Sequence, residues 1–140
     1  MKPSHHVVIS FVSGVILSML VSSYQSGIAC FLSGVLIDID HHLEYYMAKG
    51  KFPFKYTDLV NFCVNERKQK IYLFLHSYEI LFILWWVIYL FSLRGIVLGI
   101  AVGMSIHILC DQIVNPLRFP FYFIFFRIKH RFNSDVFYKS

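Results

Sequence analysis

The sequence predicts an all-α integral membrane protein, built as a four-helix transmembrane bundle with a cytoplasmic helical loop and an interfacial C-terminal segment. Three observations predict this class. Hydrophobic residues make up 57% of the 140-residue chain and charged residues only 15%, far from the balance of a soluble domain. The apolar residues gather into long runs, and a run of about 20 can cross a bilayer. Polar residues fall between the runs, so residues 1–140 read as a single membrane domain.

Four apolar segments are the predicted spans, and they cover residues 7–24, 27–37, 71–93 and 95–114. The first, third and fourth have about the length that a transmembrane helix needs. The first also resembles a secretory signal, but its apolar stretch is longer than a usual signal core and no A-x-A-like cleavage site follows. The second is short, so we expect it to tilt or to end in a polar interior among the other helices.

Two polar segments complete the chain. Residues 38–70 form the predicted cytoplasmic loop, in which Thr57 is a candidate N-cap for a helix. We expect this loop to fold over the functional site, with a passive linker as the alternative. Residues 115–140 form a basic tail that begins where Pro116 breaks the fourth helix. The aromatic run 119–126 within the tail is too short to cross a membrane, so we expect an interfacial or packed segment.

The basic residues predict how the spans are oriented. Of the 13 lysines and arginines, only Arg94 falls in the short turn between the third and fourth spans. The positive-inside rule therefore places the loop, the tail and both termini of this multi-pass protein in the cytoplasm. The net charge of +5 favours membrane lipid and phosphate-bearing substrates as partners. No sequence feature indicates a nucleic-acid partner.

Titratable residues gather at the cytoplasmic ends of the predicted spans. Such groups are costly in hydrocarbon, so a cluster of them beside apolar segments marks a functional site. At a rise of about 1.5 Å per residue, His76 lies about 7 to 8 Å below the cytoplasmic start of its span, and His107 about 10 Å from the end of its own. The predicted metal ligands are His5, His6, Asp38, Asp40, His41, His76, His107 and Asp111.

Spacing along the predicted helices adds support for this site. His107 and Asp111 are four residues apart, and His76 and Glu79 are three apart. Each pair therefore shares a helix face, where the acid can bind the same ion or orient the imidazole. We take Asp40 and Glu79 as the candidate catalytic acids.

The two aspartates that follow the second span have a structural alternative, because Asp38 and Asp40 could simply cap its interfacial end. They sit at the C-terminal end of the predicted helix, however, where the helix dipole disfavours anions and a cation partner is wanted. A lone histidine such as His76 is likewise more often a packing residue than a ligand. The sequence leaves open which member binds in two adjacent pairs, His5 with His6 and His41 with His42.

The donor set mixes imidazoles with carboxylates. The three cysteines, Cys30, Cys63 and Cys110, show no CxxC spacing, so no thiolate site is indicated. Zinc is the first choice for such donors, with manganese and iron(II) as alternatives. The number of candidate ligands allows one or more ions. A two-metal centre can hold a phosphoryl oxygen and lower the pKa of a bridging water, so the natural chemistry is hydrolysis.

Short motifs along the chain follow a recognisable order. They are a histidine near the N terminus (His5 or His6), Asp-x-Asp-His (Asp38, Asp40, His41), His-Ser (His76, Ser77) and His-xxx-Asp before Asn-Pro (His107, Asp111). In this series the chain resembles small bacterial inner-membrane proteins known as predicted membrane-bound metal-dependent hydrolases, some of them SOS/LexA-regulated. The resemblance covers most of the chain. It implies an inner-membrane location and a metal-dependent hydrolytic activity.

The same ligand order is more distantly similar to that of zinc-dependent phospholipase C, an all-helical enzyme with a trinuclear zinc site. That similarity implies hydrolysis of phosphoesters such as phospholipid. One local departure concerns the residues ahead of His76. The hydrolase pattern has Gly-x-Thr there, and this chain has Leu73-Phe74-Leu75, which draws attention to Glu79 as an additional acid.

We therefore predict a membrane-embedded metal-dependent hydrolase with a His/Asp centre at the cytoplasmic rim. The alternative from a different class is a non-catalytic metal-binding membrane protein, either a sensor or a component of divalent-ion transport. A transporter needs polar groups through both leaflets, whereas the outer half of every predicted span is apolar. A structural membrane protein with incidental histidines is a third hypothesis, which the one-sided gathering of the titratable residues disfavours.

Overall fold

The computed structural model describes residues 3–64 and 70–138, and within them every regular element is a helix. This confirms the all-α prediction. Seven α-helices and two short 3-10 helices follow one another in this order: α1 (Pro3–Leu20), α2 (Tyr24–Leu36), α3 (Ile39–Lys49), α4 (Tyr56–Val64), α5 (Tyr78–Phe91), α6 (Ile96–Val114), η1 (Phe119–Tyr122), α7 (Ile124–Lys129) and η2 (Ser134–Val136).

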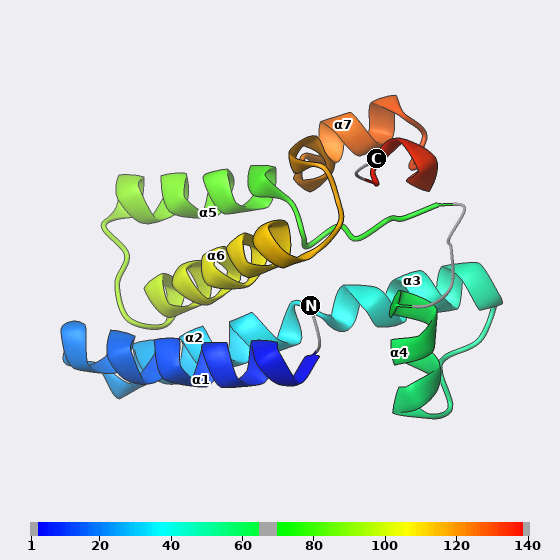
Figure 1. Cartoon of the computed structure of the whole chain (residues 1–140). Helices are drawn as coiled ribbons and strands as arrows, with labels where there is room; N and C mark the ends of the chain where they lie inside the picture. The colour runs from blue at the N-terminus through cyan, green and yellow to red at the C-terminus, as the bar shows by residue number, and fades with distance from the viewer. Residues whose placement is uncertain (1–2, 65–69, 139–140) are drawn as a thin grey trace.

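Four of these helices, α1, α2, α5 and α6, run side by side, and α6 contacts each of the other three (Figure 1). Glycines allow the closest approaches. Gly14 of α1 faces Gly27 of α2, and a Cβ on either would lie about 2.5 Å from the other's carbonyl oxygen. On α6, a Cβ at Gly99 would collide with the carbonyl oxygen of Ser26, and a Cβ at Gly103 would collide with that of Cys30, both in α2. Small residues of this kind let helix backbones pack closely, as membrane helices commonly do.

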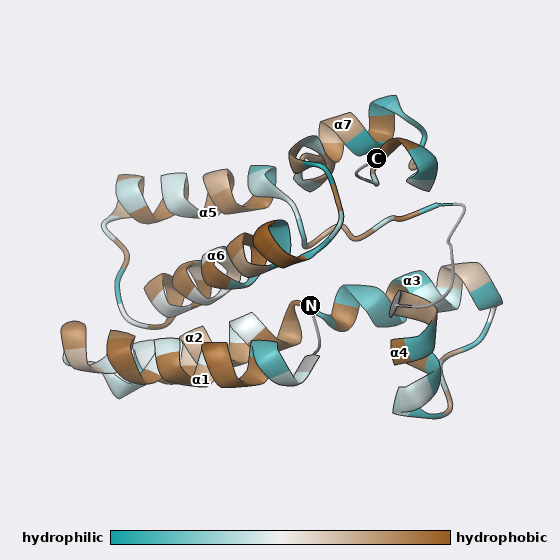
Figure 2. Ribbon diagram, viewed as in Figure 1, coloured by the Kyte–Doolittle hydropathy of each residue, from teal (hydrophilic) through white to brown (hydrophobic). Residues whose placement is uncertain are grey.

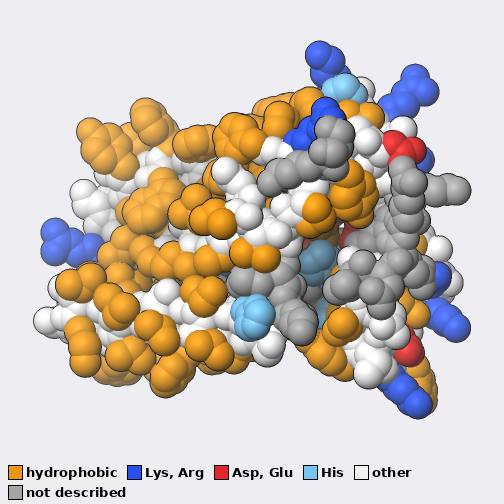
Figure 3. Space-filling model, viewed as in Figure 1, with side chains coloured by type: hydrophobic (Ala, Val, Ile, Leu, Met, Phe, Trp, Pro, Cys, Tyr) orange, Lys and Arg blue, Asp and Glu red, His pale blue; other side chains and the backbone are white. Residues whose placement is uncertain are grey.

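The outer surface of this four-helix layer is strongly apolar. Large apolar side chains are exposed along α1 and α5, among them Met19 at 74% and Phe91 at 70% of their full accessible area. In Figure 2 the ribbon of α1, α2, α5 and α6 is largely hydrophobic in colour. Figure 3 likewise shows hydrophobic side chains spread over the end of the molecule that holds these helices, while most charged side chains lie at the other end. Among the described helices, only α6 is both long and apolar enough to cross a membrane; α1 and α5 are shorter apolar helices. Apolar surface on this scale marks contact with a membrane or a partner.

The third predicted span begins later than its apolar run suggests. Helix α5 starts at Tyr78, and the preceding residues 70–77, which we call the arm, have no helical structure. The arm pairs instead with the C-terminal part of the chain, through an antiparallel bridge between Lys70 and Asn133 and a hydrogen bond from the Ile71 amide to the Phe132 carbonyl (3.0 Å). The prediction that residues 71–77 are helical is therefore wrong.

The predicted cytoplasmic loop contains two helices, α3 and α4, in place of one. Helix α3 follows α2 after a two-residue joint at Ile37 and Asp38, and it ends at Gly50, whose φ of 70° is the left-handed conformation that favours glycine. Helix α4 begins at Tyr56, so Thr57 lies inside its first turn and is not the N-cap that we expected for a helix from about 58 to 70. Residues 65–69 of that expectation lie outside the described residues.

The aromatic run of the tail is packed against the rest of the protein. Phe121 and Tyr122 of η1 are each 1% exposed, and they join a core cluster with Phe137 and with Ile71 and Leu73 of the arm. This cluster fixes the tail against the arm and the polar end of α6. The arm is thus part of this aromatic cluster, which lies beside the glycine-lined helix layer. A smaller buried cluster of Tyr45, Leu59 and Phe62 joins α3 to α4.

Candidate metal centre

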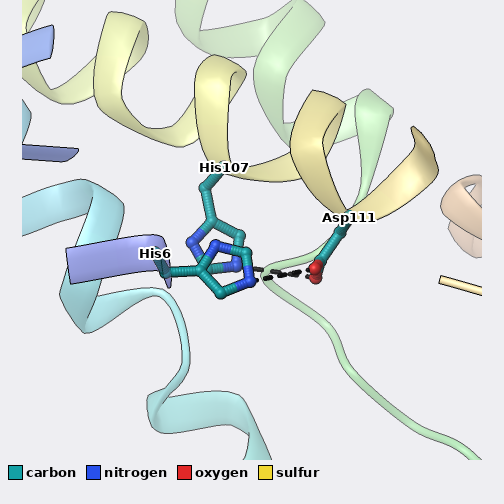
Figure 4. A group of neighbouring side chains, drawn as sticks. All are labelled: His6, His107 and Asp111. Atoms are coloured by element: carbon teal, nitrogen blue, oxygen red, sulfur yellow. Dashed lines mark ion pairs between the residues drawn. The ribbon is translucent and has the colours of Figure 1, made fainter. Parts of the chain in front are cut away.

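Five polar side chains from four parts of the chain meet where the helix layer joins the aromatic cluster. His107 and Asp111 come from α6, and Figure 4 shows His6 of α1 turned toward both. Asp38 enters from the joint between α2 and α3, and His76 from the end of the arm. All but Asp38 are at least 94% buried. The structure thus brings together five of the eight predicted ligands, although Asp38 and His76 come from outside the helices that were expected to carry them.

The donor atoms lie at the separations that a shared cation requires. The Nε2 atom of His6 is 3.0 Å from Asp111 Oδ1. The Nε2 atom of His107 is 3.3 Å from Asp38 Oδ1 and 3.6 Å from Asp111 Oδ2. The Nε2 atom of His76 is 3.6 Å from Asp38 Oδ1 and 3.7 Å from Asp111 Oδ2. Donors about 2.0 Å from a tetrahedral zinc ion stand about 3.3 Å from one another, so these spacings fit.

The donors form two overlapping groups that share His107. His6, His107 and Asp111 make one group, and Asp38, His76 and His107 make the other; within each group one donor atom per residue lies within 4.8 Å of the others. The Nε2 atoms of His76 and His107 are buried and have no hydrogen bond of acceptable geometry. A buried nitrogen that is left without a partner is costly unless a ligand satisfies it. The residues present therefore fit a metal ion, and the two groups allow more than one.

Acceptors behind two of the imidazoles fix their orientation. His107 Nδ1 lies 2.7 Å from the Gly34 carbonyl oxygen, and His76 Nδ1 lies 3.3 Å from Asp40 Oδ2. With an acceptor at Nδ1, each neutral ring carries its proton there and presents the Nε2 lone pair to the centre. The His6 ring stacks on that of His107, with centroids 3.9 Å apart. The histidines are thus held in the tautomer and direction that metal binding needs.

Neighbouring charges set the pKa values of Asp38 and His76. Burial raises the pKa of Asp38, but contacts with His107 and His76 outweigh this effect and hold that pKa well below its usual range. Burial lowers the pKa of His76, whereas contacts with the carboxylates of Asp38 and Asp40 raise it more, so the net shift is upward. Anionic carboxylates therefore favour a cation at the centre, and a proton on His76 competes for that place.

The structure separates the adjacent histidine pairs. His6 is buried at the centre while His5 is exposed. His41 lies at the edge, 22% exposed, with Nε2 3.7 Å from Asp38 Oδ1; His42 is exposed. His6 is thus the N-terminal histidine that can bind, and His41 is a peripheral donor.

The two candidate catalytic acids lie outside the ring of donors. Asp40 is behind His76, where it contacts Nδ1 and accepts a hydrogen bond from the Leu75 amide. Glu79 points away, and its carboxylate accepts hydrogen bonds from the amides of Ile124 (2.9 Å) and Phe125 (3.2 Å) at the start of α7. The shared helix face expected for His76 and Glu79 does not exist, because His76 precedes α5.

Two buried charged residues of this region were not predicted from the sequence. Glu44 is 2% exposed and contacts His41 Nδ1 at 3.6 Å. It stands four residues after Asp40, a spacing that could have identified it as a second acid on the same face of α3. Arg127 is fully buried behind the arm. In the sequence it is one of several basic residues of the tail, and nothing in its spacing distinguishes it.

A cavity of about 470 Å³ lies beside the centre. Asp38 and His76 form part of its polar end, and apolar side chains of α4 and of the tail form its walls, among them Leu59, Val60, Leu117 and Phe121. In Figure 3, histidine side chains are visible near the boundary between the apolar surface and the end of the molecule with most charged groups. The loop helix α4 therefore lines the cavity beside the site, and the mixed polar and apolar lining can hold a molecule that has both polar and apolar groups.

Comparisons with protein-family models, curated proteins and solved structures found no match for this chain. The resemblance to membrane-bound metal-dependent hydrolases stays a prediction that depends on the short motifs. The case for a function therefore depends on the geometry of the cluster and the cavity beside it.

Proposed function

We propose that this protein is a metal-dependent hydrolase of the membrane, with phosphoesters as its substrate class. The observation that carries the proposal is the pair of buried Nε2 atoms, on His76 and His107, that face two carboxylates without a hydrogen bond of their own. A cluster without ligands would leave these atoms unsatisfied in the protein interior, at a cost of about 1 to 3 kcal/mol each. Metal binding removes that cost.

His6, His107 and Asp111 would hold one ion, and Asp38 and His76 complete the set for a second ion or an enlarged single site. Mixed imidazole and carboxylate donors suit zinc first, then manganese or iron(II). Such an ion would polarise a phosphoryl oxygen and lower the pKa of a bound water.

Asp38 is the acid best placed to receive a proton from the attacking water. Its side chain is 27% exposed and lines the cavity, and its low pKa keeps it ionised at neutral pH. In the hydrolysis, the water oxygen bonds to phosphorus, the bond from phosphorus to the leaving alcohol breaks, and that alcohol takes up a proton. Asp40 orients His76 and does not face the substrate.

The cavity supports a substrate that carries an apolar group, such as a phospholipid. Its lining includes the cluster residues Asp38, His76 and Asp111 together with apolar side chains such as Leu59 and Phe121. A phosphate at the cluster would place the acyl or alkyl group against these apolar side chains.

We further propose that α1, α2, α5 and α6 span a bacterial inner membrane as a four-helix bundle with both termini in the cytoplasm. The exposed apolar side chains of α1 and α5 support this arrangement, since water would otherwise surround them. The basic residues support the orientation, because Arg94 lies in the turn between α5 and α6, opposite the cluster. The centre would then sit at the cytoplasmic rim, and the short α2 and α5 would end in its polar surroundings.

A non-catalytic metal-binding protein is the second candidate function. The cavity favours the hydrolase, because a sensor or transport component does not need an apolar pocket beside its ion. The buried donors gather at one end of the helix layer, and ion transport needs a polar path through the whole membrane.

The test uses protein purified in detergent, with bound metal measured by mass spectrometry and hydrolysis measured on a soluble phosphoester and on a phospholipid. The comparison is a double variant, Asp38→Ala with His107→Ala, and the control is His5→Ala, which removes an exposed histidine. We expect stoichiometric metal and metal-dependent hydrolysis in the wild type and the control, and neither in the double variant. Metal-replete protein that hydrolyses neither substrate would refute the hydrolase, and folded protein that binds no metal would refute both candidate functions.

A further inference from the structure

We propose that Arg127 is a positioning residue that, together with Asp40 and Glu44, fixes the arm (residues 70–77) and so determines where the His76 imidazole lies. The inference rests on the metal centre of the proposed function and goes beyond it, because none of these three side chains needs to touch metal or substrate. It assigns a functional role to a basic residue of the tail and replaces the catalytic role expected of Asp40.

Arg127 binds the carbonyl side of the arm. Its Nη1 atom donates to the Tyr72 carbonyl at 2.7 Å and to that of Leu73, and its Nη2 atom donates to the His76 carbonyl at 3.2 Å. Burial lowers the Arg127 pKa to about 10, so the guanidinium stays charged at neutral pH. Hydrogen bonds from a charged donor are about twice as strong as neutral ones, and only the planar fork of arginine reaches three carbonyls at once.

The acids of α3 bind the amide side of the same segment. The Tyr72 amide donates to Glu44 Oε1 at 3.3 Å, and the Leu75 amide donates to Asp40. Both carboxyl groups are nearly fully buried, with Asp40 at 4% and Glu44 at 2% exposure. The arm has no helix of its own to satisfy its backbone, so buried charges from two other parts of the chain satisfy it instead.

The position of Arg127 is itself fixed by the start of α5. Glu79, two residues after the arm, caps α7 at Ile124 and Phe125, and a carboxylate at a helix N-terminus is favourable. The Arg127 guanidinium also lies 5.2 Å from the centre of the Phe121 ring. Both ends of α7 therefore contact the chain around His76. Its first residues donate hydrogen bonds to Glu79, and Arg127 in its last turn donates to the His76 carbonyl.

The contacts reach the metal donor as well as the backbone. Asp40 binds the Leu75 amide and the His76 Nδ1 atom with the same oxygen, and Arg127 binds the carbonyl of His76 itself. A shift of the arm would therefore move the Nε2 atom of His76 relative to Asp38 and Asp111. Donor atoms must be held to within about 0.5 Å for an effective site. Arg127 therefore affects metal binding by His76 although its own side chain does not contact the metal donor atoms.

The test compares Arg127→Met and Arg127→Lys with Arg118→Met in the full chain. Arg118 is the control, because it is an arginine of the tail whose Nε atom donates to a backbone carbonyl away from the arm, that of Tyr138 at 3.0 Å. Zinc affinity is measured by competition with a chelator, and the coordination geometry by the visible spectrum of cobalt-loaded protein. We expect zinc to bind about 10- to 100-fold more weakly to Arg127→Met, with an altered cobalt spectrum, and we expect wild-type values for Arg118→Met. Arg127→Lys should fall between them.

Hydrogen exchange of the metal-free protein provides a second measurement that needs neither metal nor activity. We expect the amides of Tyr72 and Leu75 to exchange at least tenfold faster in Arg127→Lys, while exchange in α6 stays unchanged. Unaltered arm exchange, or unaltered zinc affinity in both Arg127 variants, would overturn the inference. A folded wild type that binds no zinc would refute the proposed metal centre. Faster arm exchange in Arg127→Lys than in wild type would still show that Arg127 holds the arm.

Discussion

Replacing His6 with alanine should remove a metal donor, while the same change at His5 should not. His6 is 5% exposed, its Nε2 atom lies 3.0 Å from Asp111, and its ring stacks on His107. His5 is one residue away and exposed. The two variants therefore remove the same chemical group from the same turn of α1, and they differ only in the direction in which that group points.

The magnitude follows from the number of donors. Four-donor zinc sites bind with about 10 to 16 kcal/mol at neutral pH, so one donor contributes about 2.5 to 4 kcal/mol. At about 1.4 kcal/mol per tenfold change, His6→Ala should weaken zinc binding about 100- to 1000-fold. A water molecule that takes the vacated position would bring the loss toward the lower figure.

The assay is competition between the protein and a fluorescent zinc chelator in detergent, at constant pH. Thermal unfolding of the metal-free variants checks that both remain folded. We expect the loss of affinity for His6→Ala alone. Equal zinc affinities for His6→Ala and wild type, or an equal loss in His5→Ala, would refute the assignment of His6 to the centre.

Three further predictions concern the surroundings of the centre. Asp40→Asn should weaken zinc binding about 10- to 100-fold, because the carboxylate that orients His76 is lost, and unchanged affinity in the chelator assay would contradict this role. Gly103→Ala should destabilise the protein by about 1 to 3 kcal/mol and so lower its melting temperature, because the added Cβ would collide with a carbonyl of α2. An unchanged thermal unfolding curve would show that α2 and α6 do not approach so closely. Zinc affinity should fall with acidification. The pKa of His76 is raised, so protons already compete with zinc for its nitrogen above about pH 6.5, the usual pKa of histidine. A zinc affinity that does not change with pH would contradict this.

The common depth of the candidate donors could be predicted from the sequence, but depth does not fix helix rotation, so their meeting could only be expected. Titratable side chains at the same predicted end of separate apolar segments lie at one level if those segments pack side by side, whatever their exact limits. The choice of His6 over His5 was also within reach. His6, Ser10, Gly14 and Leu17 recur at intervals of three or four and are all buried, so the small residues of α1 already mark the face that points inward.

The arm could not be predicted, because its structure depends on residues far away in the chain. Ile71 to Leu75 are apolar, and a short apolar run fits a helix and an extended segment equally well. The partners that select the extended form are the Phe132 carbonyl and the Arg127 guanidinium, and no local pattern links these to the arm. The error about Glu79 followed directly, because its expected place beside His76 required a continuous helix.

The distribution of the centre along the chain has a consequence for biogenesis. His6 lies near the start of the described chain and Arg127 near its end, and the other donors come from segments that are made in between. A nascent fragment that lacks the tail lacks the Arg127 contacts with the arm, so under the proposed function it would offer only an incomplete site to metal. Under the proposed function, metal loading would therefore be a late step that follows the docking of the tail.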